Sequence, residues 1–395
     1  KPNKGVHVGQ LKKAITLLEE AKKPMFLIGG GVNLAHAQQE MTKLAEKIDA
    51  PVITTVMGRG AISTEHPLYI GNIGMHGSYA ANKTADECDL MFSIGCRFND
   101  RVTGEIKKFA PNAKIVHIDI ESAAISRNVT VDIPIVADAK AAILKILEHT
   151  EPMEHKEWLD EIQGWDKEYP LQMEVKDGVN PQRIIETLNE VYADRDTVFT
   201  SDVGQHQMWA SQYLKLDATH RLVQSGGLGT MGFGLPSAVG AQIGCPEKSI
   251  VSISGDGGFQ MNMQELATAV CQELPLVNIV FNNNRLGMVR QMQELFFKKR
   301  YTITCLRYHK SCKGKCGTPG WVCPEYVPDF VKMAEAYGTK GYFVTEDEQL
   351  RDTILEARDY AEKNKKPVIV ECMVAPDELV MPMIKGGASF EDIML

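Results

Sequence analysis

The amino-acid sequence predicts an α/β protein with two tandem doubly wound sheets, mostly parallel and flanked by helices. Short apolar runs alternate with stretches of helical periodicity almost from end to end. Polar residues do not alternate within these runs, which is typical of strands covered on both faces. The length of 395 residues also fits two to three domains, at roughly 150 residues for each.

Composition and charge exclude several other classes of protein. Hydrophobic residues make up 44% of the chain and charged residues 24%, a balance that excludes a disordered or collagen-like chain. Every apolar run is shorter than the roughly 18 residues that a membrane span needs. The net charge of −8 provides no basic surface for nucleic acid. Nine cysteines are too few for a disulfide scaffold, and no signal peptide follows Lys1, so we expect a cytoplasmic protein.

The first domain is predicted at residues 1–150. Amphipathic stretches such as 35–48 and 139–147 separate its short apolar runs and are expected to be helices. The strands are expected at Met25–Ile28, Val52–Thr55, Leu90–Ile94, Ile115–Ile118 and Ile133–Val136.

A break in this pattern at 151–178 predicts a linker. The segment contains Pro152, two tryptophans and scattered charges, and we interpret it as a connection with a short helix. The second domain is predicted at 179–395. Its strands are expected near Val198–Thr200, Ile250–Ile253, Val277–Phe281, Tyr342–Val344 and Val368–Cys372.

Two polar residues of the second domain stand where ligands of a metal ion are expected. Asp256 follows one apolar run, and Asn283 follows the next. If the two strands are neighbours, both side chains face the crevice at the carboxyl edge of the sheet, where open α/β sheets bind ligands. Carboxylate and amide oxygens suit Mg²⁺ that carries a phosphate, and adjacent glycines allow a diphosphate to approach. The alternative is two unrelated turns, because Gly-Asp-Gly and Asn-Asn are common in turns.

A dinucleotide-binding loop is the other candidate in this region. Gly227, Gly229 and Gly232 match G-x-G-x-x-G after an extended run at Arg221–Gln224, and Asp256 lies 24 residues beyond the last glycine. A dinucleotide-binding loop gives no role to the asparagines at 282–284. We therefore favour the metal and diphosphate site.

Longer motifs support that preference and identify a family. The sequence strongly resembles the catalytic large subunit of acetohydroxyacid synthase, also called acetolactate synthase, a thiamine-diphosphate enzyme. The resemblance covers the whole chain except an insertion near 302–327. It rests on GDG at 255–257, NN at 282–283, DVGQHQMW at 202–209, GTMGFGLP at 229–236, RLGMV at 285–289, IGMHG at 73–77, GCRFNDR at 95–101 and HIDI at 117–120.

The resemblance implies a binding site for thiamine diphosphate and Mg²⁺ in the second domain. The side chains of Asp256 and Asn283 and the backbone carbonyl of Arg285 would hold the metal. Met231 would force the bent form of the cofactor, and the Gly229 carbonyl would bind its aminopyrimidine ring. The alternative for Met231 is packing in the hydrophobic core, which is the usual role of methionine. The residues expected at the diphosphate are Val203, Gln205, His206, Gly255, Gly257 and Gly258.

The resemblance also implies FAD along the strand ends of the first domain, with a structural rather than a redox role. For Gly29–Gly31 the alternative is a tight turn between a strand and a helix. The residues expected at FAD are Gly29, Gly30, Thr55, Met57, Met75, His76, Arg97, Asp119, Ile120 and Asp138.

Three residues are assigned to substrate by the same resemblance. Arg101 would bind the substrate carboxylate, since a guanidinium offers a bidentate fit, and the alternative is a surface arginine. Met288 would line the active site, or pack in the core. Met292 stands where the family usually carries a tryptophan, so we expect a looser pocket for the second ketoacid.

The implied reaction is decarboxylation of pyruvate and ligation to a second 2-ketoacid, giving acetolactate or acetohydroxybutyrate for branched-chain amino acid synthesis. The implied partners are a second copy, as homodimer or homotetramer, and a regulatory small subunit. Family members carry a preceding domain with the glutamate that protonates the cofactor, and we expect this chain to lack it. The alternatives are a pyruvate oxidase-like enzyme and a non-catalytic cofactor-binding fragment.

The insertion contains a cluster of cysteines. Cys305, Cys312, Cys316 and Cys323 lie within 19 residues, which raises a Zn²⁺ or iron–sulfur site. Only Cys312 and Cys316 have the usual spacing of such ligands. The alternative is a loop with free thiols or labile disulfides.

Overall fold

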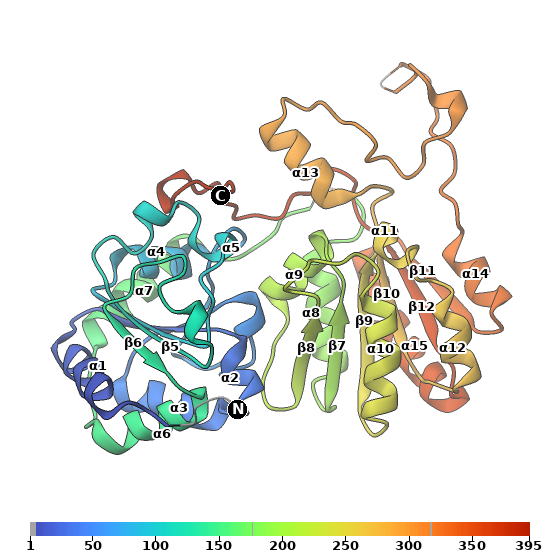
Figure 1. Ribbon diagram of the computed structural model, residues 1–395. Helices are drawn as coiled ribbons and strands as arrows, with labels where there is room; N and C mark the ends of the chain where they lie inside the picture. The colour runs from blue at the N-terminus through green and yellow to red at the C-terminus, as the bar shows by residue number, and fades with distance from the viewer. Residues whose placement is uncertain (1–4, 176, 317) are drawn as a thin grey trace. The chain divides into compact units, whose positions relative to one another are not determined.

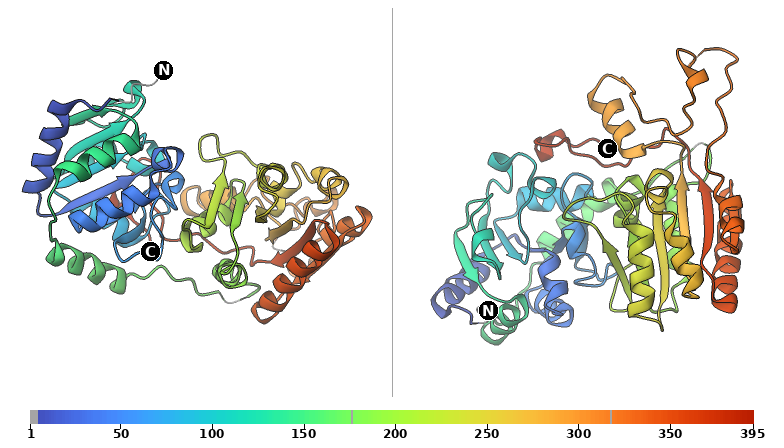
Figure 2. Two further views of the ribbon diagram at one scale, coloured as in Figure 1. Left: turned by 90° about the horizontal axis from the view of Figure 1, so that it is seen from below. Right: turned by 45° about the vertical axis from the view of Figure 1, so that its right-hand side comes forward.

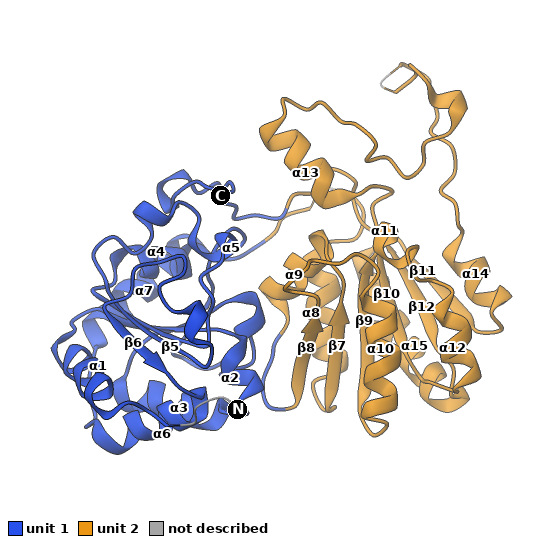
Figure 3. Ribbon diagram, in the orientation of Figure 1, with its two compact units in different colours: residues 1–172, 215–218, 380–395 blue, residues 173–214, 219–379 orange. Residues whose placement is uncertain are grey.

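The chain divides into two compact units (Figure 3). The structure is a computed structural model that describes residues 5–175, 177–316 and 318–395. Unit 1 contains the chain up to Gln172 together with 215–218 and 380–395, and unit 2 contains 173–214 and 219–379. Within the described part of the chain, no helix is long and apolar enough to cross a membrane.

Unit 1 is built around a parallel sheet in the order β3-β2-β1-β4-β5-β6. Figure 1 labels β5 and β6 of this sheet. The strands are β1 (Pro24–Ile28), β2 (Val52–Thr54), β3 (Tyr69–Asn72), β4 (Leu90–Ile94), β5 (Lys114–Asp119) and β6 (Ile133–Val136). The α-helices are α1 (Val8–Glu20), α2 (Gly30–Leu34), α3 (Gln38–Ile48), α4 (Tyr79–Glu87), α5 (Asp100–Thr103), α6 (Ala139–His149) and α7 (Lys156–Glu168). The 3₁₀ turns are η1 (Val56–Gly58), η2 (Ile106–Lys108), η3 (Ser122–Ala124) and η6 (Phe390–Asp392).

Unit 2 has a second parallel sheet, in the order β11-β12-β10-β9-β7-β8. The strands are β7 (Thr197–Ser201), β8 (His220–Gln224), β9 (Ser249–Gly255), β10 (Val277–Asn282), β11 (Lys340–Val344) and β12 (Val368–Met373). The α-helices are α8 (Pro181–Val191), α9 (Gln205–Tyr213), α10 (Gly234–Gly244), α11 (Asp256–Phe259), α12 (Glu265–Cys271), α13 (Gly287–Phe296), α14 (Phe330–Ala336) and α15 (Leu350–Asn364). The 3₁₀ turns are η4 (Lys310–Cys312) and η5 (Asp347–Gln349).

The predicted fold class is confirmed, and burial on both faces explains the continuous apolar runs. In β1, Phe26 and Ile28 pack in one core cluster, and Met25 and Leu27 pack in another on the opposite face. Helices lie on both faces of each sheet (Figure 2). Because successive side chains of a strand point to opposite faces, a strand covered on both faces needs apolar residues at every position.

Two strands lie outside the expected set, and both are at sheet edges. The strand β3 contains Gly71, is only partly buried, and pairs with β2 through an irregular register. In β8 the burial pattern alternates between exposed and partly buried residues. Both strands are less buried than the central strands and lack the continuous apolar run by which those strands were predicted.

The expected linker 151–178 contributes a helix to unit 1. On α7, Trp158 is 2% exposed, its Nε1 donates a hydrogen bond to the Pro24 carbonyl at 3.0 Å, and Ile162 packs in the same core cluster. The end of the chain also belongs to unit 1, since the amide of Ile384 donates to the Met75 carbonyl at 2.8 Å. In the structure most of the expected linker therefore belongs to unit 1, and unit 2 begins at Met173.

Trp158→Ala is expected to lower the free energy of unfolding of unit 1 by about 3–5 kcal/mol, because it empties a core site and leaves the Pro24 carbonyl without its donor. Urea unfolding followed by circular dichroism measures this loss. Trp158→Phe, which keeps most of the ring, is the control and should lose less. A loss below about 1 kcal/mol for Trp158→Ala would show that α7 does not contribute to the core.

Candidate functional site

The polar residues predicted at the strand ends of the second sheet do meet at one edge. In the pairing of β9 with β10, Gly255 lies opposite Phe281. Asp256 follows β9 directly and is 2% exposed, and Asn283 follows β10 directly and is 7% exposed. Two buried oxygen-bearing side chains therefore leave neighbouring parallel strands at the carboxyl edge, which is where open α/β sheets bind ligands.

Asp256 carries a carboxylate oxygen that lacks a partner. Its Oδ1 accepts a hydrogen bond from the Gly257 amide at 2.9 Å, whereas its Oδ2 is buried and makes no hydrogen bond within the described residues. Burial raises the pKa of Asp256 to about 8, against the opposing effect of backbone amides at Gly257, Asn284 and Arg285. A buried carboxylate with a bare oxygen fits a bound cation, which would stabilise its charge.

Asn283 is held by a chain of amide side chains. Its Oδ1 accepts from the Arg285 amide at 3.1 Å, and its Nδ2 donates to Oε1 of Gln205 at 3.1 Å. The Nε2 of Gln205 donates in turn to Oε1 of Gln291, on α13, at 2.9 Å. Gly287 leaves the necessary space, because a Cβ there would lie 2.1 Å from Oε1 of Gln205. These hydrogen bonds between amide side chains fix the loop 283–287 against the start of α9.

Asp202 is a residue of this site to which sequence reasoning gave no role. It follows β7 and is fully buried, its Oδ1 lies 3.0 Å from Nε2 of His206, and its Oδ2 accepts from the Gly232 amide at 3.0 Å. A Cβ on Gly258 would lie 1.7 Å from Oδ2 of Asp202. The sequence feature that could have identified Asp202 is its position directly after a strand, a position that Asp256 and Asn283 share.

The glycines expected at the diphosphate are required by close packing. A Cβ on Gly255 would lie 2.9 Å from Nδ1 of His206. A Cβ on Gly257 would lie 2.8 Å from Cδ2 of Leu286 and 3.5 Å from Cε of Met231. The structure thus brings His206 and Met231 to the glycine turn, and Met231 is only partly buried rather than packed in the core.

The remaining thiamine-site candidates lie in two places. Val203 lies beside the turn at Gly229, since its Cγ2 would be 3.7 Å from a Cβ there and its amide donates to the Thr230 carbonyl at 3.4 Å. Met288 and Met292 lie one turn apart on α13, and neither is fully buried. The structure therefore brings Val203 close to Gly229, and it places the two methionines on α13, the helix that follows the loop 283–287.

The insertion near 302–327 begins by pairing with the loop 283–287. The Leu286 amide donates to the Thr304 carbonyl at 2.8 Å, and the Leu306 amide donates to the Asn284 carbonyl at 2.9 Å. No group of three or more His, Cys, Asp or Glu side chains that could hold a metal occurs among the described residues. The prediction of a zinc or iron–sulfur site in the insertion therefore gains no support. Its cysteines range from the buried Cys312 to the exposed Cys316 and Cys323.

In unit 1 the glycines expected at FAD form a close backbone crossing. A Cβ on Gly29 would lie 2.0 Å from the carbonyl oxygen of Gly95, and the Gly31 amide donates to the same carbonyl at 3.2 Å. Gly30 begins α2. The tight turn between strand and helix, the alternative to a cofactor role, is present and by itself accounts for Gly29 and Gly31.

The other candidates for FAD follow the strands of unit 1 at the same carboxyl edge. Asp138 caps α6 by accepting from the Ala141 amide, and Asp119 ends β5. Met57 and Ile120 are exposed by 42% and 46%. Exposed apolar side chains at the ligand-binding edge of such a sheet fit an extended ligand with an aromatic part. Thr55, Met75, His76 and Arg97 also follow strands of this sheet.

Arg101 and His76 lie near each other in unit 1. The Met75 amide donates to the Arg101 carbonyl at 3.0 Å, while the Arg101 side chain is 66% exposed. Burial lowers the pKa of His76 to about 4, and the charge of Arg101 also lowers it, against hydrogen bonding with the backbone of Pro382. Arg101 therefore presents an accessible guanidinium.

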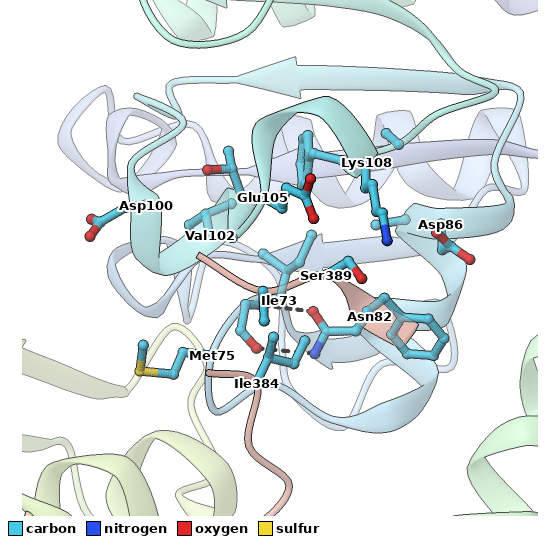
Figure 4. Close-up of a pocket in the computed structure, with 18 of the residues that line it drawn as sticks. Ile73, Met75, Asn82, Asp86, Asp100, Val102, Glu105, Lys108, Ile384 and Ser389 are labelled. Atoms are coloured by element: carbon cyan, nitrogen blue, oxygen red, sulfur yellow. Dashed lines mark hydrogen bonds between the residues drawn. The ribbon is translucent and has the colours of Figure 1, made fainter. Parts of the chain in front are cut away.

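A small pocket lies beside Met75 (Figure 4). Ile384 and Ser389, from the end of the chain, line it together with Asn82, which exchanges two hydrogen bonds with the backbone of Gly74. Its volume is about 40 Å³, and one water needs about 10–15 Å³. The pocket therefore has room for a few waters and is too small for a cofactor.

Each unit contains a region that matches a known protein family. Residues 11–146 match the model of the thiamine pyrophosphate enzyme central domain, and residues 202–372 match that of the C-terminal TPP-binding domain. The chain belongs to the thiamine pyrophosphate enzymes. The second match begins at Asp202 and contains Asp256 and Asn283.

Named relatives of this thiamine pyrophosphate enzyme are acetolactate synthases. It is 40% identical over 405 residues to a probable acetolactate synthase large subunit of Methanococcus aeolicus, a match with 98% of this chain and 64% of the relative. It is 39% identical over 394 residues to the isozyme 3 large subunit of Escherichia coli, covering 98% of this chain and 65% of the relative. The chain thus spans somewhat less than two thirds of the length of these relatives.

Asp256→Asn is expected to weaken Mg²⁺-dependent binding of thiamine diphosphate by at least about tenfold, because it removes the one carboxylate of the cation site. Isothermal titration with and without Mg²⁺ measures it. Without metal, the free energy of unfolding should stay within about 1 kcal/mol, since asparagine keeps the shape and removes a charge that burial disfavours. Asp359→Asn, at an exposed carboxylate on α15, is the control. Unchanged cofactor binding in Asp256→Asn would refute the metal role.

His76 is expected to make unit 1 less stable as the pH falls from about 6.5 towards about 4. In this window the unfolded chain takes up a proton that the folded chain does not, so folding loses free energy. His76→Gln should reduce the difference in unfolding free energy between pH 7 and pH 5 by on the order of 1–2 kcal/mol. Urea titrations at both pH values measure it. His149→Gln, at an exposed position on α6, should leave the difference unchanged, and an equal difference in His76→Gln contradicts the assignment.

Proposed function

We propose that the chain is the cofactor-binding part of an acetolactate synthase large subunit. The observation that carries the proposal is the pair Asp256 and Asn283 at one sheet edge, with a buried carboxylate oxygen that has no partner among the described residues. The names of the relatives and the TPP-binding domain agree with it.

In this proposal Mg²⁺ is held by Asp256, Asn283 and the carbonyl of Arg285. The glycine turn 255–258, at the start of α11, would hold the diphosphate, because its residues bring no side chain between the backbone and the ligand. Gln205, His206 and Val203 border the diphosphate, and their positions around Asp202 and the amide chain support this. Met231 and the Gly229 carbonyl contact the organic part of the cofactor.

Thiamine diphosphate supplies, when bound, a nucleophilic carbon and an electron sink for decarboxylation of a 2-ketoacid. The protein's share is binding and orientation. Arg101 pairs with the substrate carboxylate through its accessible guanidinium. Met288 and Met292 border the substrates from α13, and Met292 leaves more space than a tryptophan would. The balanced reaction converts two molecules of pyruvate into acetolactate and CO₂, or uses 2-ketobutyrate as the second ketoacid.

Unit 1 binds FAD along its carboxyl edge in this proposal, in a structural role. Gly29 and Gly30 would border it at the first strand, and the exposed Met57 and Ile120 offer apolar surface to it. The four-cysteine metal site is left out, because the described residues gather no ligand set for it. The other residues assigned to FAD are Thr55, Met75, His76, Arg97, Asp119 and Asp138.

The relatives' names also suggest partners. A large subunit implies a regulatory small subunit, and we propose such a partner for this chain, with a homodimer or homotetramer as its own assembly. We also propose a cytoplasmic location, in keeping with the free cysteines that the structure describes.

Acetolactate formation from pyruvate tests the proposal. The chain is supplied with thiamine diphosphate, Mg²⁺ and FAD, alone and with the region of the Methanococcus aeolicus relative that lies outside the match, added separately or joined to the chain. We expect acetolactate only with that region, because the family resemblance assigns it the glutamate that activates the cofactor. Loss of acetolactate formation in Asp256→Asn would show that the reaction uses the site at Asp256.

Two results would contradict the proposal. Bound cofactors without acetolactate from the joined protein would remove the assigned reaction and leave a cofactor-binding module. Reduction of bound FAD by pyruvate at the rate of turnover would instead indicate an oxidase.

A further inference from the structure

A second cavity lies in unit 2 at the amino edge of the sheet, opposite Asp256 and Asn283. It lies where β9 and β10 begin, at Ser249 and Val277, which is the lower end of this sheet in Figure 1. Strand β9 has seven residues, so roughly 20 Å separates the two edges. The volume of about 210 Å³ far exceeds the about 10–15 Å³ that one water needs.

Cationic side chains outnumber anionic ones around this cavity. Arg195, Lys248, Arg358 and Lys365 line it, against Glu247 and Glu362. This excess occurs in a chain whose net charge is −8. The aspartates that pair with three of these cations, Asp194, Asp196 and Asp359, are not among the lining residues.

Two of the four cations are already engaged. Arg358 donates to the Val191 carbonyl at 2.8 Å and to Oδ1 of Asp359 at 3.0 Å, and Lys248 lies 3.0 Å from Asp196. The other two are available to a ligand.

Arg195 is the better placed of the available cations. Its guanidinium lies 3.8 Å from Glu362 and 3.9 Å from Asp194, and it makes no side-chain hydrogen bond to the described residues. Lys365, at the end of α15, forms no ion pair within the same part of the chain. A ligand with an anionic group would meet both without displacing an existing close contact.

The buried hydroxyl of Tyr192 independently indicates a ligand. The side chain lines the cavity and is 1% exposed, and its hydroxyl has no hydrogen-bond partner among the described residues. Burial raises its pKa, so the group is a neutral donor, and the charges of Arg358 and Arg195 act on it in the opposite direction. Buried hydroxyls are normally hydrogen-bonded, and a missing partner requires an explanation.

Helix ends offer a simpler account of some of these cations. Helices α8 and α15 end at this edge, and cations stabilise the negative ends of helix dipoles. This accounts for Arg358, which binds a carbonyl of α8, and for Lys365. It does not account for the unpartnered hydroxyl of Tyr192. Apolar groups of Pro246, Ile250, Pro275 and Val277 complete the lining and suit a ligand with a short apolar body.

We propose that this cavity binds a small organic oxyanion, a carboxylate or a phosphate ester. Arg195 and Lys365 pair with its anionic group, and the Tyr192 hydroxyl donates a hydrogen bond to it. The site is separate from the proposed thiamine diphosphate site and does not depend on the proposed function.

Calorimetric titration of the chain with two probes, inorganic phosphate and isovalerate, tests the proposal. Saturating thiamine diphosphate and Mg²⁺ are present throughout, so that the glycine turn is occupied. We expect one probe at least to bind saturably, and neutral isovaleramide not to bind. Binding of phosphate alone indicates a phosphate ester as the natural ligand, and binding of isovalerate alone indicates a carboxylate.

Variants show whether the probe occupies this cavity. Arg195→Gln should weaken binding about tenfold or more, since it removes a charge-assisted contact. Tyr192→Phe should weaken it about fivefold without lowering the free energy of unfolding, because it removes a hydroxyl that the ligand-free chain does not use. Arg351→Gln, at an exposed position on α15 outside the cavity, is the matched control and should bind normally.

Three results would overturn the proposal. They are no saturable binding of either probe at millimolar concentration, equal binding of isovaleramide, and binding that Arg195→Gln leaves unchanged. The Arg195 side chain is 41% exposed and has only two long ion-pair contacts among the described residues, at 3.8 and 3.9 Å, so its replacement should leave the fold intact. It therefore decides the question even if Tyr192→Phe disturbs packing.

Discussion

The buried carboxylate of Asp202 is the interaction on which the candidate thiamine site depends. It lies at the end of β7 and contacts His206 through one oxygen and the Gly232 amide through the other. Gly258 leaves the space that this carboxylate occupies. One fully buried side chain thus fixes the start of α9, the turn before α10 and the glycine turn after β9. A charged group hydrogen-bonded on both oxygens is costly to disturb, because either partner's loss leaves a buried charge unsatisfied.

Around this anchor the site shows a contrast between two acids. Asp202 has partners on both oxygens and serves the protein's own structure. Asp256 follows the neighbouring strand, and its buried Oδ2 has no hydrogen-bond partner in the part of the chain that the structure describes. A buried polar group that is hydrogen-bonded within the protein is accounted for by the fold alone. A buried polar atom without a hydrogen-bond partner instead indicates a place for a ligand. The difference between the two carboxylates, rather than their shared position, is what points to a cation at Asp256.

Much of this arrangement could be predicted from the sequence. Central strands such as β4 and β10 are buried on both faces, so their apolar runs show them, and polar residues directly after such runs must lie at the carboxyl edge. The edge strands β3 and β8 could not be found in this way. The role of Asp202 and the packing of α7 were also hidden, because Trp158 meets the Pro24 carbonyl across 134 positions of sequence. Contacts between distant segments have no local signature.

At each edge of the second sheet, a buried polar atom without a partner in the described part of the chain lies among groups that suit a charged ligand, and the sign of that charge differs between the two edges. At the carboxyl edge, Oδ2 of Asp256 is one of the buried atoms that have no partner among the described residues. It lies beside backbone amides and the start of α11, and a cation that carries phosphate would suit both. At the amino edge the unsatisfied atom is the hydroxyl of Tyr192, among cations that outnumber the anions. Helices of a parallel α/β sheet all end at this second edge, which attracts basic side chains to it. Arg358 pairs with a carbonyl at the end of α8, whereas Arg195 and Lys365 also line the cavity and are available to an anion.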